Sequence, residues 1–221
     1  GGPGTARLEA ATLLGQIGDP RATAALLAGL SDEDSAVRAA CADALALHGK
    51  DSAPLLVAAL KDDRPGVRAE AARALGAMGD GASASALRPL LHDPDEQVRK
   101  YTCSALGSLK ASDTVPDLLT CLNDPSLSVR LAALEALAAL GDERALPGAS
   151  SMVSDPHAEV RLGVCRVLRH IAHPSAAQAL AALIGDSDAS VRAAACEAMA
   201  HQSANAEIGP LVNALGDSDQ T

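Results

Sequence analysis

The dipeptide Val-Arg recurs along this chain at an almost constant interval. Its six copies begin at Val37, Val67, Val98, Val129, Val160 and Val191, so the steps are 30, 31, 31, 31 and 31 residues. An Asp stands six residues before each Arg; the aspartates are Asp32, Asp62, Asp93, Asp124, Asp155 and Asp186, and the arginines are Arg38, Arg68, Arg99, Arg130, Arg161 and Arg192. Ala6-Arg7 fits one step earlier, and Asp217 begins a further unit. Self-similarity at a fixed period is the signature of a repeat protein, so we count seven repeats in the 221 residues.

The segment after each Val-Arg has the pattern of an amphipathic helix. In the fifth repeat its apolar positions are Val129, Ala133, Leu137 and Leu140, which lie on one helical face. The register of Leu137 is filled elsewhere by Leu14, Leu45, Leu75, Leu106, Leu168 and Met199. N-cap residues are expected at Asp34, Asp95, Ser126 and Asp188. Left-handed C-terminal glycines are expected at Gly18, Gly49, Gly79 and Gly141.

A second, shorter helix follows in each repeat. In the fourth repeat Val115, Leu118, Leu119 and Leu122 form its inner side. Prolines fall in the first turn of this helix, where the missing N–H costs nothing; they are Pro54, Pro116 and Pro147. Pro89 lies too deep for that rule, so the third repeat should have a kink or a late helix start.

Two short helices cannot bury an apolar face alone, so consecutive pairs must stack into one continuous core. The sequence therefore predicts an all-α array that forms a single domain over residues 4–219. Its repeats are 4–34, 35–64, 65–95, 96–126, 127–157, 158–188 and 189–219. We expect the chain to be part of a larger chain or complex.

The pattern Asp-x5-Val-Arg-x2-Ala-x2-Ala-Leu-x3-Gly, followed by Ala-x-Leu-x3-Leu, resembles the short HEAT-like repeats of the phycobilin-lyase type. The resemblance covers residues 4–219 and implies a right-handed α-α superhelix of the HEAT and armadillo type, with about seven two-helix repeats of 30–31 residues. It also implies that the Asp and Arg of successive repeats form a ladder of hydrogen bonds inside the stack. Relatives of this class include bilin lyase subunits, a deoxyhypusine hydroxylase and many bacterial scaffolds.

Composition excludes several classes of function. The net charge of −10 argues against a nucleic-acid binder, which needs a basic surface. No apolar run is long enough to span a membrane and no signal peptide is visible, so we expect a cytoplasmic protein. The cysteines, Cys41, Cys103, Cys121, Cys165 and Cys196, are scattered, and we expect buried reduced thiols that need neither a metal nor another cofactor.

The sequence contains no convincing catalytic set. No His is followed by Glu, although the hydroxylase relatives hold a di-iron site with His-Glu dyads, so that activity is not expected. Cys165, His170 and His173 make a conceivable metal trio, but a histidine at a helix C-terminus is also favoured by the helix dipole. A bilin lyase would need a tetrapyrrole pocket, and the chain has one Tyr and no Phe or Trp.

The expected function is protein binding without catalysis. In HEAT arrays the second helices line the concave surface, and their exposed register here is small and nearly uncharged. Two adjacent lines describe it: Ala25, Leu55, Ala86, Asp117, Gly148, Ala179 and Pro210, then Ala28, Ala58, Pro89, Thr120, Ser151, Ala182 and Asn213. We predict that Ala86, Asp117, Thr120, Ser151, Ala182 and Asn213 contact a protein partner, favoured if it carries a basic segment because the turns are rich in Asp. The alternatives are a curved inner face without a partner and a bilin-lyase-type enzyme or enzyme subunit that handles a tetrapyrrole.

Overall fold

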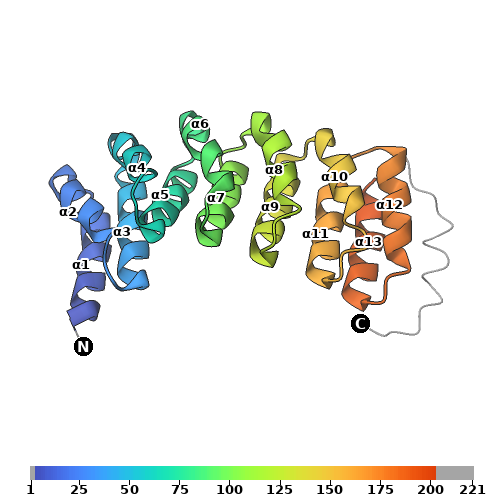
Figure 1. Ribbon diagram of the computed structural model, residues 1–221, viewed down its shortest axis with the longest axis horizontal. Coiled ribbons are helices and arrows are strands. Elements are labelled where there is room, and N and C mark those ends of the chain that lie inside the picture. The colour runs from blue at the N-terminus through green and yellow to red at the C-terminus, as the bar shows by residue number, and fades with distance from the viewer. Residues whose placement is uncertain (1–2, 203–221) are drawn as a thin grey trace. The chain divides into compact units, whose positions relative to one another are not determined.

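The computed structural model describes residues 3–202, and this part of the chain contains thirteen α-helices, short 3-10 helices and no strand (Figure 1). The chain divides into two compact units, Gly1–Ala111 and Ser112–Thr221. Each contains pairs of a long and a short helix, as the repeat predicts. The single-domain span 4–219 stays a prediction, and most of the seventh repeat lies outside the described residues.

Unit 1 is built on four long helices, each packed against the next. They are α1 (Pro3–Ile17), α3 (Ser35–Leu47), α5 (Pro65–Met78) and α7 (Glu96–Ser108). The short helices are α2 (Thr23–Gly29), α4 (Ala53–Ala59) and α6 (Ala84–Leu87), and each packs on the long helix that follows it.

Unit 2 repeats the arrangement. Its long helices α9 (Leu127–Leu140), α11 (Ala158–Leu168) and α13 (Ala189–His201) pack in sequence. The helices α8 (Val115–Cys121), α10 (Leu146–Ser151) and α12 (Pro174–Ile184) lie on them in the same alternation.

The core consists of leucines at one register of the long helices and of alanines where the helices come closest. Leu45, Leu75, Leu106, Leu137, Leu168 and Met199 are all 0% exposed, as their shared register predicts. In unit 1 a Cβ added to Gly76 would lie 2.7 Å from the Cα of Ala105, so α5 and α7 approach within backbone contact. Small side chains permit this spacing, which explains why the chain needs almost no aromatic residue.

The predicted helix ends are confirmed in most repeats. Asp34, Asp95 and Asp188 cap α3, α7 and α13 through their carboxylates. Ser126 holds the N-cap position of α9 but makes no capping bond, because its hydroxyl contacts that of Ser128 at 2.9 Å. The four predicted glycines have φ values between 62° and 71°; they are Gly18, Gly49, Gly79 and Gly141.

The third repeat departs from the others at the predicted place. The α-helix α6 ends at Leu87 after four residues, and a 3-10 helix, Arg88–His92, continues it with Pro89 in its first turn. The interruption is thus a change of helix type rather than a late start. Pro89 cannot donate the N–H that an α-helix would use at this depth.

Lys110 occupies the position that glycine holds in four other repeats. Its φ is +53°, the one positive value at a non-glycine residue among residues 3–202. We expect Lys110→Gly to raise the free energy of unfolding by about 1 kcal/mol, because the left-handed conformation strains a residue with a Cβ. Urea unfolding of this variant and of Gly141→Lys measures the effect. Opposite shifts in the two variants are expected, and a loss in Lys110→Gly would contradict this account of the turn.

Candidate functional site

The loops between repeats in unit 1 are joined by ion pairs, and the one between Arg68 and Asp93 is mostly buried. Arg68 Nε and Nη2 donate to the two carboxylate oxygens of Asp93, both at 2.8 Å. Its Nη1 donates to the carbonyl oxygens of Asp62 and Asp63, at 2.8 and 3.0 Å. The side chains of Arg68 and Asp93 are 13% and 8% exposed. One guanidinium therefore ties the loop before its own helix to the loop of the next repeat, with charge-assisted bonds to both.

Two further pairs have the same geometry. Arg7 bonds Asp32 at 2.7 and 3.0 Å in unit 1, and Arg161 bonds Asp186 at 2.6 and 2.7 Å in unit 2. The Arg161 hydrogen bond keeps the pKa of Asp186 below its ordinary value, so this carboxylate is ionised at neutral pH. All six aspartates of the repeat pattern also accept a bond from the backbone N–H two residues later.

One predicted pair is replaced by another. Arg38 donates to the carbonyl oxygens of Asp32 and Glu33, but its buried Nε has no partner among the described residues. Asp62 is instead held by Arg64, whose Nε and Nη2 both lie at 2.8 Å. The bond from Arg64 lowers the pKa of Asp62 to about 2. A side chain two residues away has therefore displaced the one from the preceding repeat.

A second pair, in unit 2, is loosened by a histidine. Arg130 Nε lies 3.7 Å from Asp155, while its Nη1 donates to the carbonyl of Asp124 at 2.9 Å. His157 Nδ1 is 3.0 Å from Asp155 Oδ1 and occupies an N-cap position that Asp fills in other repeats. Arg99 and Arg192 keep the carbonyl bond, each at 2.9 Å to the Asp six residues earlier.

The predicted binding residues lie at two depths. In unit 2, Thr120, Ser151 and Ala182 are exposed and Asp117 is half-buried. Ala86, in unit 1, is also half-buried. Asn213 and Pro210 lie outside the described residues. Of the two lines of residues, the second is therefore the one that faces solvent at each of its described positions.

The second line, which we call the docking stripe after the partner binding predicted for it, has almost no projecting side chains. It comprises Ala28, Ala58 and Pro89 in unit 1 and Thr120, Ser151 and Ala182 in unit 2, all exposed. Thr120 Oγ1 donates to the carbonyl of Asp117 at 2.6 Å, and Ser151 Oγ donates to that of Gly148 at 2.7 Å. Both hydroxyls are thus turned back onto their own helices. A Cβ at Gly148 would meet Leu119 Cδ2 at 2.4 Å, so glycine lets α10 pack closely on α8.

A groove beside the stripe in unit 2 was not predicted. It has a volume of about 630 Å³ and is lined by Glu143, Arg144, Leu146, Pro147, Ser150, His173 and Ser175. Two lining residues adjoin the two lines on α10: Pro147 comes directly before Gly148 of the first line, and Ser150 directly before Ser151 of the second. The sixth repeat has no 3-10 turn before its second helix, since α12 begins at Pro174 with His173 as N-cap. The sequence offered one sign of this difference. His173 occupies the position at which, in the fifth repeat, Asp142 caps the 3-10 helix Glu143–Ala145.

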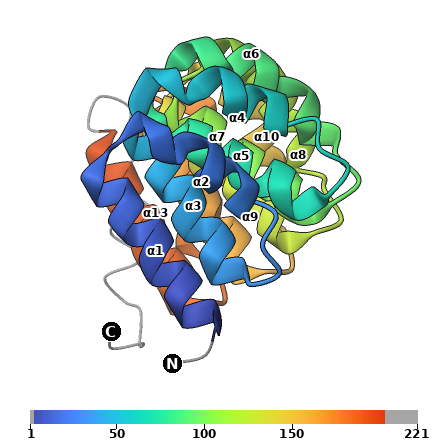
Figure 2. The ribbon, with the colours of Figure 1, turned by 90° about the vertical axis from the view of Figure 1, so that its left-hand side faces the viewer.

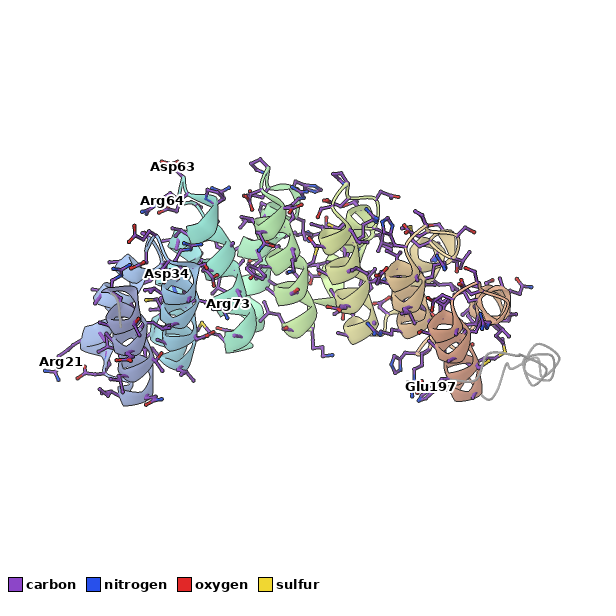
Figure 3. The ribbon with its side chains drawn as sticks, turned by 90° about the horizontal axis from the view of Figure 1, so that it is seen from below. Arg21, Asp34, Asp63, Arg64, Arg73 and Glu197 are labelled. Atoms are coloured by element: carbon purple, nitrogen blue, oxygen red, sulfur yellow. The ribbon has the colours of Figure 1, made fainter. Side chains whose placement is uncertain are left out.

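The turns carry less free negative charge than their count of aspartates suggests. Asp32, Asp93 and Asp186 are compensated by arginines. Asp63 and Glu96 remain exposed in unit 1, and Figure 3 shows Asp63 at the tip of the turn between α4 and α5. The three paired aspartates therefore add little uncompensated negative charge to the turns.

The outer sides of the long helices carry ion pairs that the sequence analysis missed. Arg73 on α5 donates to Asp43 Oδ1 at 2.6 Å and to the carbonyl of Ala39 at 2.8 Å, both on α3, and also bonds Glu70. In unit 2, Arg169 bonds Glu197 at 2.9 Å. These side chains link neighbouring helices, so Arg73 and Glu197, labelled in Figure 3, serve internal packing.

The candidate metal trio is not assembled. His170 packs edge-on against His201, with ring centroids 5.6 Å apart, and His173 Nδ1 accepts the N–H of Ser175. Burial raises the pKa of the Cys165 thiol to about 12, which keeps it protonated. Residues 3–202 hold no cluster of three or more His, Cys, Asp or Glu side chains that could bind a metal ion. None of the helices in this range combines the length and the apolar character needed to cross a bilayer.

Comparison with solved structures shows the same fold in several proteins. YibA of E. coli aligns with a TM-score of 0.71 at 18% identity, over 95% of this chain and 81% of that one. The CpcE–CpcF complex of phycocyanin lyase from Nostoc sp. PCC7120 aligns with a TM-score of 0.59 at 23% identity, over 88% of each chain. A designed armadillo repeat protein in complex with the peptide (KR)4 aligns with a TM-score of 0.59 at 20% identity, over 80% and 98%.

The sequence comparisons agree with the fold. A search of the curated proteins found no match. The sequence profile of the HEAT repeats matches four overlapping segments, 3–53, 25–97, 85–152 and 146–221, which together extend from residue 3 to the last residue. The chain therefore belongs to the HEAT-repeat family.

Proposed function

We propose that this protein is a non-catalytic scaffold that binds a protein partner through the docking stripe on its second helices. The observation that carries the proposal is the exposure of this stripe together with its lack of projecting side chains. Thr120 and Ser151 turn their hydroxyls onto their own helix carbonyls, so another backbone can approach α8 and α10 closely. Large aromatic anchors are absent from the stripe, so affinity would come from shape and from main-chain contacts.

The groove in unit 2 supports the same proposal. Its lining combines apolar Leu146 and Pro147 with polar Ser150 and His173. Such a mixed surface beside a smooth stripe suits an extended segment with alternating side chains, one set in the groove and one facing solvent.

We propose that the bound segment is basic. Asp63 and Glu96 are exposed beside the loops, and the net charge of −10 favours a cationic partner. A designed relative of this fold binds the peptide (KR)4. We place this interaction in the cytoplasm, in keeping with five cysteines that are not joined in disulfides within residues 3–202.

Arginine substitution on the stripe tests the proposal. We expect Ser151→Arg to abolish capture of the partner from an extract of the source cells, measured by quantitative mass spectrometry, because the long side chain blocks backbone approach. The thermal midpoint should not change, since Ser151 is exposed. Ser151 is a better probe than Ala86, whose half-burial would confuse a binding loss with a folding defect.

Glu135→Arg is the matched control, because Glu135 is exposed on α9, a long helix of the same unit. The control should retain the partner. The proposal is wrong if Ser151→Arg keeps the partner at the wild-type level, or if Glu135→Arg loses it.

A bilin-lyase-type function is the alternative, because a phycocyanin lyase complex has this fold. The groove holds Arg144, a group that could pair with a propionate, but Arg144 already bonds Asp142 and the carbonyl of Ser112. An absorbance scan after mixing with a bilin separates the two functions. We expect no spectral shift, and a shift lost in Arg144→Ala would favour the lyase function.

A further inference from the structure

Arg38 carries a positive charge to which no carboxylate bonds within residues 3–202. Its Nη1 donates to the carbonyl oxygens of Asp32 and Glu33, at 2.8 and 3.0 Å. The carboxylate of Asp62, its expected partner, bonds Arg64. The Nε of Arg38 is buried and has no hydrogen-bond partner in the described part of the chain. A guanidinium N–H held away from water is stabilised by an acceptor, so this edge of Arg38 favours an anion.

Arg38 lines a pocket between the loop that follows α2 and the first turn of α5. The pocket has a volume of about 250 Å³, and its lining includes Asp32, Arg38, Arg64 and Gly66. The helix that carries Arg38, α3, packs on both α2 and α5 (Figure 2). The pocket is therefore framed by packed helices of unit 1, and it is large enough for a small organic anion.

Gly66 opens this pocket beside the guanidinium of Arg38. A Cβ added to Gly66 would lie 3.3 Å from Arg38 Nε and 3.8 Å from its Nη2. Every other repeat has a residue with a Cβ at this position: Thr5, Ala36, Gln97, Ser128, Glu159 and Ser190. In α3, α7 and α13 the backbone N–H of this position donates to the N-cap side chain. The N-cap of α5 is Arg64, whose side chain cannot accept, so the Gly66 N–H is a further donor in the lining.

We propose that the pocket binds a carboxylate group of a molecule outside the chain, through Arg38, Arg64 and the N–H of Gly66. The next repeat shows the same chemistry within the chain. There Nε and Nη2 of Arg68 donate to the two carboxylate oxygens of Asp93, both at 2.8 Å. A planar carboxylate matches the edge of a guanidinium with two parallel bonds.

The charges of the lining favour an anion with one negative charge over an anion with two. Asp32 is compensated, because Arg7 bonds both of its oxygens, at 2.7 and 3.0 Å. Arg64 is compensated by Asp62, although its Nη1 takes no part in that pair. The charge of Arg38 thus stays uncompensated within the lining. A carboxylate neutralises it, whereas the second charge of a phosphate dianion would be repelled by the Asp32 carboxylate.

Acetate is the probe that tests this site. We expect the Nε–H resonance of Arg38 in ¹⁵N NMR spectra to shift with added sodium acetate and to saturate in the millimolar range, as a few charge-assisted bonds would give. Sodium chloride keeps the ionic strength constant, because Glu33 and Asp63, exposed next to residues of the lining, repel anions. A shift that does not saturate would overturn the proposal.

Gly66→Ala fills the pocket and leaves every charge in place. We expect it to weaken acetate binding roughly tenfold or more without lowering the thermal midpoint, because alanine suits a helix better than glycine does. Arg38→Gln should abolish binding, followed on the Gly66 N–H resonance, with circular dichroism to verify its fold. Arg21→Gln is the control with the same change of net charge, since Arg21 is 91% exposed and bonds Asp19. Unchanged acetate affinity in Gly66→Ala, or a loss in Arg21→Gln, would overturn the proposal.

Two further probes identify the source of the carboxylate. A capped tripeptide with a central Asp that binds more tightly than acetate assigns the carboxylate to a protein segment, and weaker binding assigns it to a free small acid. Inorganic phosphate should bind more weakly than acetate. Tighter binding of phosphate would contradict the choice of a carboxylate.

Discussion

Arg68→Ala should lower the free energy of unfolding by about 3 kcal/mol, since it removes one partner of a mostly buried pair and leaves the other charge uncompensated. Arg68 makes four hydrogen bonds, two to Asp93 and two to loop carbonyls, and its side chain is 13% exposed. The truncation therefore leaves the Asp93 carboxylate, which is 8% exposed, without its cationic partner, and it removes the donor to the carbonyl oxygens of Asp62 and Asp63. Urea unfolding followed by circular dichroism measures the loss.

Two other arginine-to-alanine variants provide the comparison for the loss of stability in Arg68→Ala. Arg21 pairs with Asp19, but its side chain is 91% exposed and points away from the helices in Figure 3, so Arg21→Ala should leave the unfolding midpoint unchanged. Arg130→Ala should fall between the two variants, because its pair with Asp155 is 3.7 Å long while its carbonyl bond is intact. Equal small losses in all three would show that the ladder does not stabilise the fold.

Gly76→Ala should lower the free energy of unfolding by about 2 kcal/mol, although alanine is the better helix former. The added Cβ would lie 2.7 Å from the Cα and 2.8 Å from the Cβ of Ala105. Backbone cannot move aside as a side chain can, so α5 and α7 must separate and their shared core must loosen. The same unfolding measurement tests this prediction.

Gly163→Ala is the matched comparison, because Gly163 also lies where two successive long helices, α9 and α11, come close. Its new Cβ would meet the side chain of Leu134, with Cδ1 at 2.7 Å, and a leucine can change rotamer. We therefore expect a smaller loss than in Gly76→Ala. A gain of stability in Gly76→Ala, as helix propensity alone would give, would show that the two helices do not approach as closely as described.

The fold was predictable because its signals are local and repeated. The register of Leu75 and Leu106, the caps at Asp34 and Asp95 and the glycine turns each depend on a few neighbouring residues, and six copies made the register unambiguous. Pro89 showed where the third repeat would differ. The form of that difference, a 3-10 helix in place of a kink, depends on packing that a pattern does not contain.

The candidate site was less predictable, since a repeat pattern treats every copy alike. Asp62 bonds Arg64 instead of Arg38 because the Arg64 side chain starts only two residues away. In the same way, His157 competes with Arg130 for Asp155. The first line was predicted to be exposed, but Ala86, Asp117, Gly148 and Ala179 are all half-buried, so the misjudged exposure belongs to the register in four repeats and not to one repeat. Such local competitions depend on which long side chain lies nearest, and the repeat period does not show this.

Site-specific photo-cross-linking shows which face of unit 2 a protein partner contacts. A photoreactive amino acid placed at Ser151, in an extract of the source cells, should form an adduct with a protein partner, and one placed at Glu135 on α9 should not. Both positions are exposed in the same unit, so reactivity alone does not separate them. Mass spectrometry of the Ser151 adduct should identify a lysine- and arginine-rich segment. Adducts from Glu135 but not from Ser151, or none from either, would contradict binding through the docking stripe.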